Sequence, residues 1–185
     1  MKALIIVDMQ NDFIDGALGT PEAQAIVENV VNKMRFHENT DTVVIFTKDT
    51  HFENYLETSE GEKLPIEHCI KGTPGWSITK EIHDEFKKGK YMTYSGYDVV
   101  NGRILKSTFG SFTLLETLAD LELDEIELCG VCTDICVISN AIMIKNFFPD
   151  VKVTVDASCC AGVTPEKHAA ALEVMKSCQI DVIGE

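Results

Sequence analysis

Cys136 is the residue in this sequence with the clearest potential as a nucleophile. It lies in Gly-Val-Cys-Thr-Asp-Ile-Cys-Val at 130–137, directly after an apolar run that indicates a buried strand. Apolar residues at three- and four-residue spacing over 138–145 predict a helix next, which Thr133 or Asp134 could cap. In the first turn of that helix, free N–H groups and the helix dipole would favour a thiolate. The alternative for a cysteine here is a buried and inert side chain.

Two ionisable side chains end other apolar runs and could serve this thiol. Asp8 ends the first run and Lys106 a later one. A carboxylate can take the thiol proton, and an ammonium lowers the thiol pKa. The thiolate could then attack an amide carbonyl, with backbone N–H groups of Cys132 and Cys136 donating to the oxyanion. Asp8 would next protonate the leaving amine and activate water. Taken singly, Asp8 could merely bind a nearby backbone N–H and Lys106 could be solvated, so it is their coincidence that favours catalysis.

A second group of residues has the composition of a metal site. Asp49 and His51 offer one oxygen and one nitrogen ligand two residues apart, and His68 could supply a third. A carboxylate with imidazoles suits zinc, iron or manganese, and the sequence does not choose among them. Without His68, a turn with a surface histidine would be the better explanation of Asp49 and His51.

The elements that must position these residues alternate between strand and helix. We expect strands at 3–7, 42–47, 103–106, 126–129, 151–155 and 180–183, and helices at 21–35, 78–87, 112–121 and 165–177, besides the helix that carries Cys136. This rhythm predicts a Rossmann-like, three-layer α/β/α fold with a six-stranded, mainly parallel sheet. The carboxyl ends of parallel strands share one edge, so the residues above would meet there. No repeat or linker is visible, so we expect a single domain over 1–185.

Composition limits the partners. The chain has 16 basic and 30 acidic residues, a formal net charge of −14, which argues against nucleic acid and anionic membranes. No apolar run approaches the roughly 20 residues of a membrane span, and no signal pattern opens the sequence. The seven cysteines lack disulfide-scaffold spacing, so we expect a cytoplasmic location.

Taken together, these motifs resemble the isochorismatase-like cysteine hydrolases, and within them the nicotinamidase group, over essentially the whole chain. Ala-Leu-Ile-Ile-Val-Asp-Met-Gln-Asn-Asp-Phe resembles the family's first strand, with Asp8 as general base. Leu-Lys-Ser-Thr-Phe-Gly-Ser-Phe matches the segment of the catalytic lysine, Lys106, and 130–137 resembles the turn of the nucleophile, Cys136. The resemblance also implies a cis peptide bond between Val131 and Cys132 that orients the oxyanion donors.

The same resemblance implies an activity and a cofactor. Asp49, His51 and His68 match the metal ligands of nicotinamidases, for which we expect zinc, with iron or manganese as alternatives. The implied reaction is hydrolysis of a small amide, nicotinamide to nicotinate and ammonia, in NAD salvage. A homo-oligomer, a dimer or a tetramer, is implied as well.

The sequence departs from the family pattern in the turn and in the metal site. Cys132 stands where the family usually has alanine, and it could be a passive apolar residue or pair with Cys136 on oxidation. No further histidine matches a fourth metal ligand, for which Glu57 or Glu60 could serve.

The substrate pocket departs as well, because the tryptophan that often precedes the third metal ligand is absent. Leu64 stands in that area, and Phe13 and Trp76 remain as aromatic candidates for the pocket. Another small amide, ureide or carbamoyl compound is therefore an alternative substrate. A non-catalytic redox-sensing or binding protein is an alternative from another class, although such a protein has no need of Asp8 and Lys106.

Overall fold

The computed structural model describes residues 1–96, 99–100 and 102–185, in which the strands form one sheet of order β3-β4-β2-β1-β5-β6-β7. Along the chain these are β1 (Lys2–Val7), β2 (Thr42–Asp49), β3 (Val99–Val100), β4 (Arg103–Lys106), β5 (Glu125–Val131), β6 (Lys152–Ala161) and β7 (Asp181–Ile183). Six strands are parallel, as predicted, and β3 pairs antiparallel with β4 at the edge. Two residues are too few to show a strand periodicity in the sequence.

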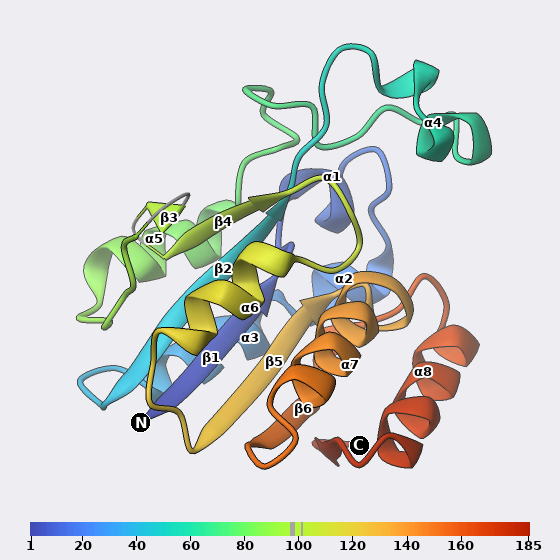
Figure 1. The fold of residues 1–185 in the computed structure, drawn as a ribbon. Helices are drawn as coiled ribbons and strands as arrows, with labels where there is room; N and C mark the ends of the chain where they lie inside the picture. The colour runs from blue at the N-terminus through green and yellow to red at the C-terminus, as the bar shows by residue number, and fades with distance from the viewer. Residues whose placement is uncertain (97–98, 101) are drawn as a thin grey trace.

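Helices cover both faces of this sheet, and Figure 1 shows α6 and α7 in front of it with α3 behind. The α-helices are α1 (Asn11–Ile14), α2 (Pro21–Ala25), α3 (Val27–Phe36), α4 (Ser59–Lys63), α5 (Lys80–Lys88), α6 (Phe112–Ala119), α7 (Ile138–Phe147) and α8 (Pro165–Ser177). A short 3₁₀ turn, η1 (Tyr55–Glu57), and a π-helical turn, η2 (Thr133–Val137), complete them. Within the described residues, no helix is long and apolar enough to cross a membrane.

The helix predicted over 21–35 is divided in two. Thr20 caps α2 through its hydroxyl, and Pro21 occupies the first turn, where its missing N–H has no bond to make. The chain then turns at Ile26, whose backbone conformation is helical but which separates α2 from α3. The apolar spacing continues through this break, which explains why periodicity alone predicted one helix.

The centre of the sheet is β1, which lies between β2 and β5 and is buried from Ala3 to Val7. An apolar run buried on both faces is typical of a central parallel strand. Val7 is opposite Gly130 of β5, whose φ of 118° lies in the left-handed region. Asp8 therefore emerges next to the segment that carries the cysteine turn, and β2 and β4 end beside it.

Candidate active site

Asp8, Lys106 and Cys136 meet at the carboxyl edge of the sheet. Lys106 Nζ lies 2.6 Å from Asp8 Oδ2 and 3.4 Å from Cys136 Sγ. The hydroxyl of Thr47 donates to Asp8 Oδ1 at 2.7 Å. All three predicted residues are buried, with Asp8 completely inaccessible. The arrangement places a carboxylate, a cation and a thiol in mutual contact, which is what proton transfer from the thiol requires.

The electrostatics of this trio differ from the expectation of a resting thiolate. Burial raises the pKa of Cys136 well above its ordinary value, and the nearby charge of Lys106 offsets only part of that. Burial likewise raises the pKa of Asp8 against the lowering effect of Lys106. The pKa of Lys106 is raised, because the attraction of Asp8 and Asp49 outweighs its burial. Cys136 therefore rests as a thiol, and Asp8 is placed to take its proton.

The cysteine turn also differs from the predicted capped helix. Cys136 lies in the π-helical turn η2, before α7 begins at Ile138, and neither predicted cap residue caps a helix. The hydroxyl of Thr133 contacts Nδ1 of His168 at 2.8 Å, and Asp134 accepts the backbone N–H of Val163 at 2.9 Å. These two bonds fasten the turn to the start of α8 and the loop before it. The peptide bond between Val131 and Cys132 is cis, as the resemblance implied.

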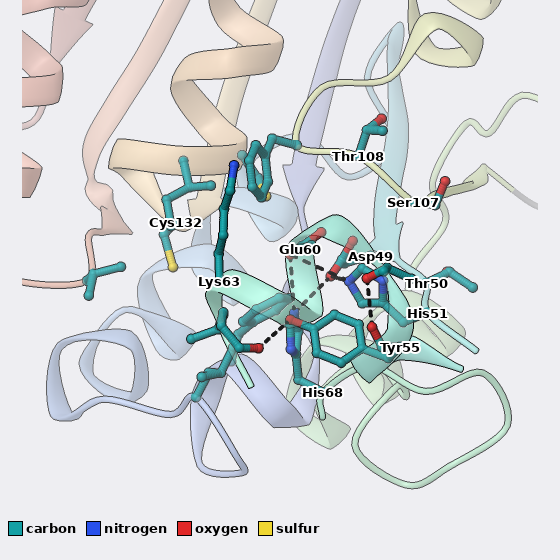
Figure 2. A pocket seen from close by; sticks show the side chains of 18 of the residues that line it. Asp49, Thr50, His51, Tyr55, Glu60, Lys63, His68, Ser107, Thr108 and Cys132 are labelled. Atoms are coloured by element: carbon teal, nitrogen blue, oxygen red, sulfur yellow. Dashed lines mark hydrogen bonds and ion pairs between the residues drawn. The ribbon is translucent and has the colours of Figure 1, made fainter. Parts of the chain in front are cut away.

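The three predicted metal ligands also come together. Ligand atoms of Asp49, His51 and His68 all lie within 4.8 Å of one another, and all three residues are buried. Figure 2 shows them converging with Glu60, whose Oε1 lies 3.8 Å from His51 Nε2 and 3.9 Å from His68 Nε2. Of the two candidates for a fourth ligand, the structure brings only Glu60 here, since Glu57 is exposed and does not line the cavity.

The unsatisfied atoms of this cluster fit a divalent metal. His51 Nε2 is buried 2.9 Å from Asp49 Oδ2, yet it has no hydrogen bond of acceptable geometry. His68 Nδ1 lies 2.9 Å from the carbonyl of Ile66, so it carries the proton and leaves Nε2 free as a ligand. Burial would raise the pKa of Asp49, but His51, His68 and Lys106 together hold it below its usual range. One carboxylate and two imidazole nitrogens thus converge as metal ligands do.

A cavity of about 810 Å³ joins the metal cluster to the cysteine turn. Phe13, Leu64, Cys132 and Cys136 line it, together with the three predicted metal ligands. Trp76 does not, contrary to the expectation from the sequence. Its indole N–H donates to the hydroxyl of Thr50, and its ring is covered by the ammonium of Lys48, 3.0 Å from the ring centre.

The whole chain matches known proteins. A family model described as the isochorismatase domain matches residues 2–184. The chain belongs to the isochorismatase domain family. The nicotinamidase/pyrazinamidase of Mycobacterium tuberculosis is 31% identical to it, over 99% of this chain and 98% of that protein. The nicotinamidase of Escherichia coli is 26% identical over 95% of this chain and 91% of its own length.

The fold of this chain is also close to solved structures of similar proteins. The pyrazinamidase/nicotinamidase of Streptococcus mutans superposes with a TM-score of 0.83 at 28% identity, covering 99% of this chain and 100% of that one. The pyrazinamidase of Pyrococcus horikoshii, solved in complex with zinc, gives a TM-score of 0.77 at 26% identity, covering 100% and 99%.

Gln10 is a positioning residue of this isochorismatase-domain protein that the sequence did not reveal. Its side-chain oxygen accepts the backbone N–H of Asp49 at 2.7 Å, and its amide donates to the carbonyls of Asp49 and Trp76 at 2.9 and 3.0 Å. Gln10 thus satisfies the backbone at the end of β2, where the sheet pairing stops. Its place two residues after Asp8 was the available clue.

Asn140 holds the cysteine turn in a comparable way. Its amide donates to the carbonyls of Cys136 at 2.8 Å and Phe109 at 3.1 Å, and its oxygen accepts the N–H of Ser111 at 3.0 Å. The residue is 1% exposed and lies on α7, one turn after the cysteine. It therefore ties the cysteine turn to the loop that follows Lys106. Nothing in the helical periodicity distinguished it from a surface asparagine.

Proposed function

We propose that this protein hydrolyses nicotinamide to nicotinate and ammonia through a thioester on Cys136. The observation that supports this most strongly is the contact of Lys106 with both Asp8 and Cys136, at the end of a cavity that also contains the Asp49–His51–His68 cluster. The relatives and solved structures named as nicotinamidases support the choice of substrate.

In the first half of the proposed reaction, Asp8 accepts the proton of Cys136 as the sulfur attacks the amide carbon. The resulting oxyanion accepts hydrogen bonds from the backbone N–H groups of Cys132 and Cys136. Asp8 then passes its proton to the leaving nitrogen, so ammonia departs and the nicotinoyl thioester remains. Lys106 stays charged throughout and stabilises whichever of Asp8 or Cys136 carries the negative charge.

In the second half, Asp8 takes a proton from water while the water oxygen attacks the thioester carbon. The carbon–sulfur bond breaks, nicotinate is released, and the proton on Asp8 returns to Cys136. One carboxyl group thus serves as base, acid and base again. This use suits a side chain whose burial raises its pKa above the ordinary value of a carboxyl group.

Asp49, His51 and His68 would hold a divalent metal, which we propose to be zinc, with Glu60 beside it. When bound, such an ion supplies a Lewis-acid contact for the pyridine nitrogen of the substrate. The chain's own contribution is a cavity wall that includes Phe13, on which the aromatic ring can pack.

A different small amide, ureide or carbamoyl compound is the second candidate substrate. Leu64 lines the cavity where the resemblance implied a tryptophan, and the volume of about 810 Å³ is near the upper end of the range for small-molecule sites, about 300–1,000 Å³. A cavity of this size admits substrates larger than a single pyridine ring.

Three accompanying properties are also proposed. We propose a role in NAD salvage, since this is the use of nicotinamide hydrolysis that the family resemblance implies. We propose a homo-oligomer on the same ground. We propose a reducing, cytoplasmic environment, which agrees with seven cysteines that are all free.

The deciding experiment measures ammonia release from nicotinamide by purified protein of known metal content. We expect a kcat/KM of about 10⁴ M⁻¹s⁻¹ or more, in the ordinary enzyme range. Cys136→Ala should abolish turnover, whereas Cys132→Ala, the matched loss of a neighbouring thiol, should keep most of it. Turnover by Cys136→Ala near the parent rate would refute the mechanism. Turnover of ureides or carbamoyl amines but not nicotinamide would select the second candidate.

A further inference from the structure

A second cavity, of about 360 Å³, lies on the other face of β2 and is lined largely by cations. Side chains alternate along a strand, so Lys48 points away from the face of Asp49. It points toward α5, as Phe46 does, whose ring meets that of Phe86 at 4.9 Å between centres. The residues described around this cavity are Lys48, Ser77, Ile78, His83, Lys87 and Arg103. None of them lines the cavity that holds Cys136.

Lys48 is the deepest cation of the set. It is 6% exposed, and its ammonium lies over the Trp76 ring, 3.0 Å from the ring centre. In the described part of the chain it has no carboxylate or hydrogen-bond partner. A buried ammonium whose contact among the described residues is an aromatic face is incompletely compensated, because a cation–π contact replaces only part of its hydration.

The carboxylates nearest on α5 are occupied elsewhere. Asp84 binds Lys80 at 2.6 Å, and Glu85 binds Arg35 at 2.9 Å and accepts the Tyr91 hydroxyl at 2.9 Å. Glu81 accepts the hydroxyl of Thr79 at 2.9 Å. No acidic residue is among those described around the cavity. In a protein of net charge −14, the residues described around this cavity include three cationic side chains and no acidic one.

We propose that this cavity is an anion site for a phosphate-type oxyanion, bound as free phosphate or as the phosphate group of a small metabolite. Lys48 and Lys87 supply ammonium donors, Arg103 a guanidinium and Ser77 a hydroxyl. Hydrogen bonds from charged groups of this kind to phosphate are stronger than hydrogen bonds between neutral groups. The volume of the cavity is at the lower end of the range for small-molecule sites, which suits an ion of this size or a short ester.

Trp76 makes the site directly measurable, because it is the only tryptophan in the chain. An anion that draws the Lys48 ammonium toward itself changes the contact with the ring. We therefore expect saturable changes in tryptophan fluorescence when the metal-loaded protein is titrated with inorganic phosphate. Sodium chloride at equal ionic strength should give no saturable change. A second titration uses glycerol phosphate. Comparing its affinity with that of inorganic phosphate shows whether the site prefers a phosphate ester or free phosphate.

Substitutions of two neighbouring lysines of α5 test whether phosphate binds in this cavity. Lys87→Gln should weaken phosphate binding about tenfold, the loss of one charge-assisted hydrogen bond. Lys88→Gln removes the same charge from an exposed side chain outside the cavity and should change binding less than twofold. Lys48→Met should lose the response altogether, and if that variant fails to fold, the Lys87→Gln comparison decides. Equal affinity in the Lys87→Gln and Lys88→Gln proteins, or no saturable response to either phosphate compound, overturns the proposal.

Discussion

Lys106 lies 2.6 Å from Asp8 in an almost fully buried ion pair. Buried pairs of this kind are costly to break, since the remaining charge loses its partner in a medium that solvates it poorly. Here Lys106 also lies 3.5 Å from Asp49, so one ammonium faces both the proposed base and a proposed metal ligand. The proposed catalytic trio and the proposed metal cluster therefore share one electrostatic environment.

Replacing Asp8 by Asn should remove the proton acceptor with little change of shape. We expect kcat to fall by about 10²–10⁴-fold, the usual contribution of a general base. The asparagine oxygen can still accept from Thr47, so the fold should persist. Single-turnover kinetics are the measurement, with Asp15→Asn, an exposed neighbour, as control. A burst of ammonia equal to the enzyme concentration would show that acylation survives without Asp8.

His51→Ala should lose the bound metal and raise KM for the amide substrate. The reason is that Asp49 and His68 alone leave too few ligands for a tight site. Metal content after dialysis, measured by elemental analysis, is the first readout, and it is independent of activity. Unchanged metal content in His51→Ala would place the ion elsewhere.

Glu60 and Glu57 provide a matched test of the fourth ligand. Glu60 Oε1 lies 3.8 Å from His51 Nε2, whereas Glu57 is exposed and does not line the cavity. We expect Glu60→Gln to weaken metal affinity about 10–100-fold, as loss of a supporting residue does. Glu57→Gln should leave it unchanged. Metal affinities can be measured by competition with a chelator. Equal affinities of the Glu60→Gln and Glu57→Gln proteins would exclude Glu60 both as a metal ligand and as a residue that supports the ligands.

A second, partly buried ion cluster predicts a pH-dependent stability. Lys33 Nζ lies 2.6 Å from Glu127 and 2.7 Å from Asp156. Burial alone would raise the pKa of both carboxyls, but their bonds with Lys33 and other neighbours outweigh it and lower both values. Their stabilising effect is therefore full above the unfolded pKa of about 4 and is lost as the pH falls through the lower folded values.

Lys33→Met should accordingly cost about 2 kcal/mol of unfolding free energy near neutral pH, because it removes the ammonium that binds both carboxylates and leaves Glu127 with His37 and Asp156 with Ser158. The difference from the parent protein should shrink as the carboxyls become protonated. Denaturant unfolding at a series of pH values measures it. Lys152→Met, which breaks an exposed pair with Glu125, should cost less than about 1 kcal/mol at any pH. A difference for Lys33→Met that stays constant with pH would contradict the argument.

The sequence predicted the sheet and the residues that meet at its edge because both depend on local patterns. Apolar runs ending in Asp8, Lys106 and the cysteine turn indicate strand ends, and parallel strands place their carboxyl ends together. The protonation state of Cys136 could not be predicted in this way, since it depends on burial by residues distant in sequence. The same holds for Trp76, which is near the metal ligands in sequence but packs on Lys48.

Positioning contacts were also beyond sequence patterns. Gln10 and Asn140 act through hydrogen bonds to backbone atoms at the end of β2 and in the cysteine turn, and such contacts depend on how segments distant in sequence come together. The π-helical turn at Thr133–Val137 was not predicted either. Its hydrogen bonds to α8 and the loop before it replace the side-chain cap that the sequence predicted.

Gly130 has a consequence for how this sequence can vary. A methyl group added there would come within 2.9 Å of three backbone atoms of Val7, pushing apart the strands that deliver Asp8 and the cysteine turn. Gly72, also at positive φ, has open space around it. In a saturation-mutagenesis library selected for activity, codon 130 should therefore return almost only glycine, while codon 72 should accept several residues at a modest cost. Substitutions at a position that contributes no side chain to the proposed active site would thus still disrupt it.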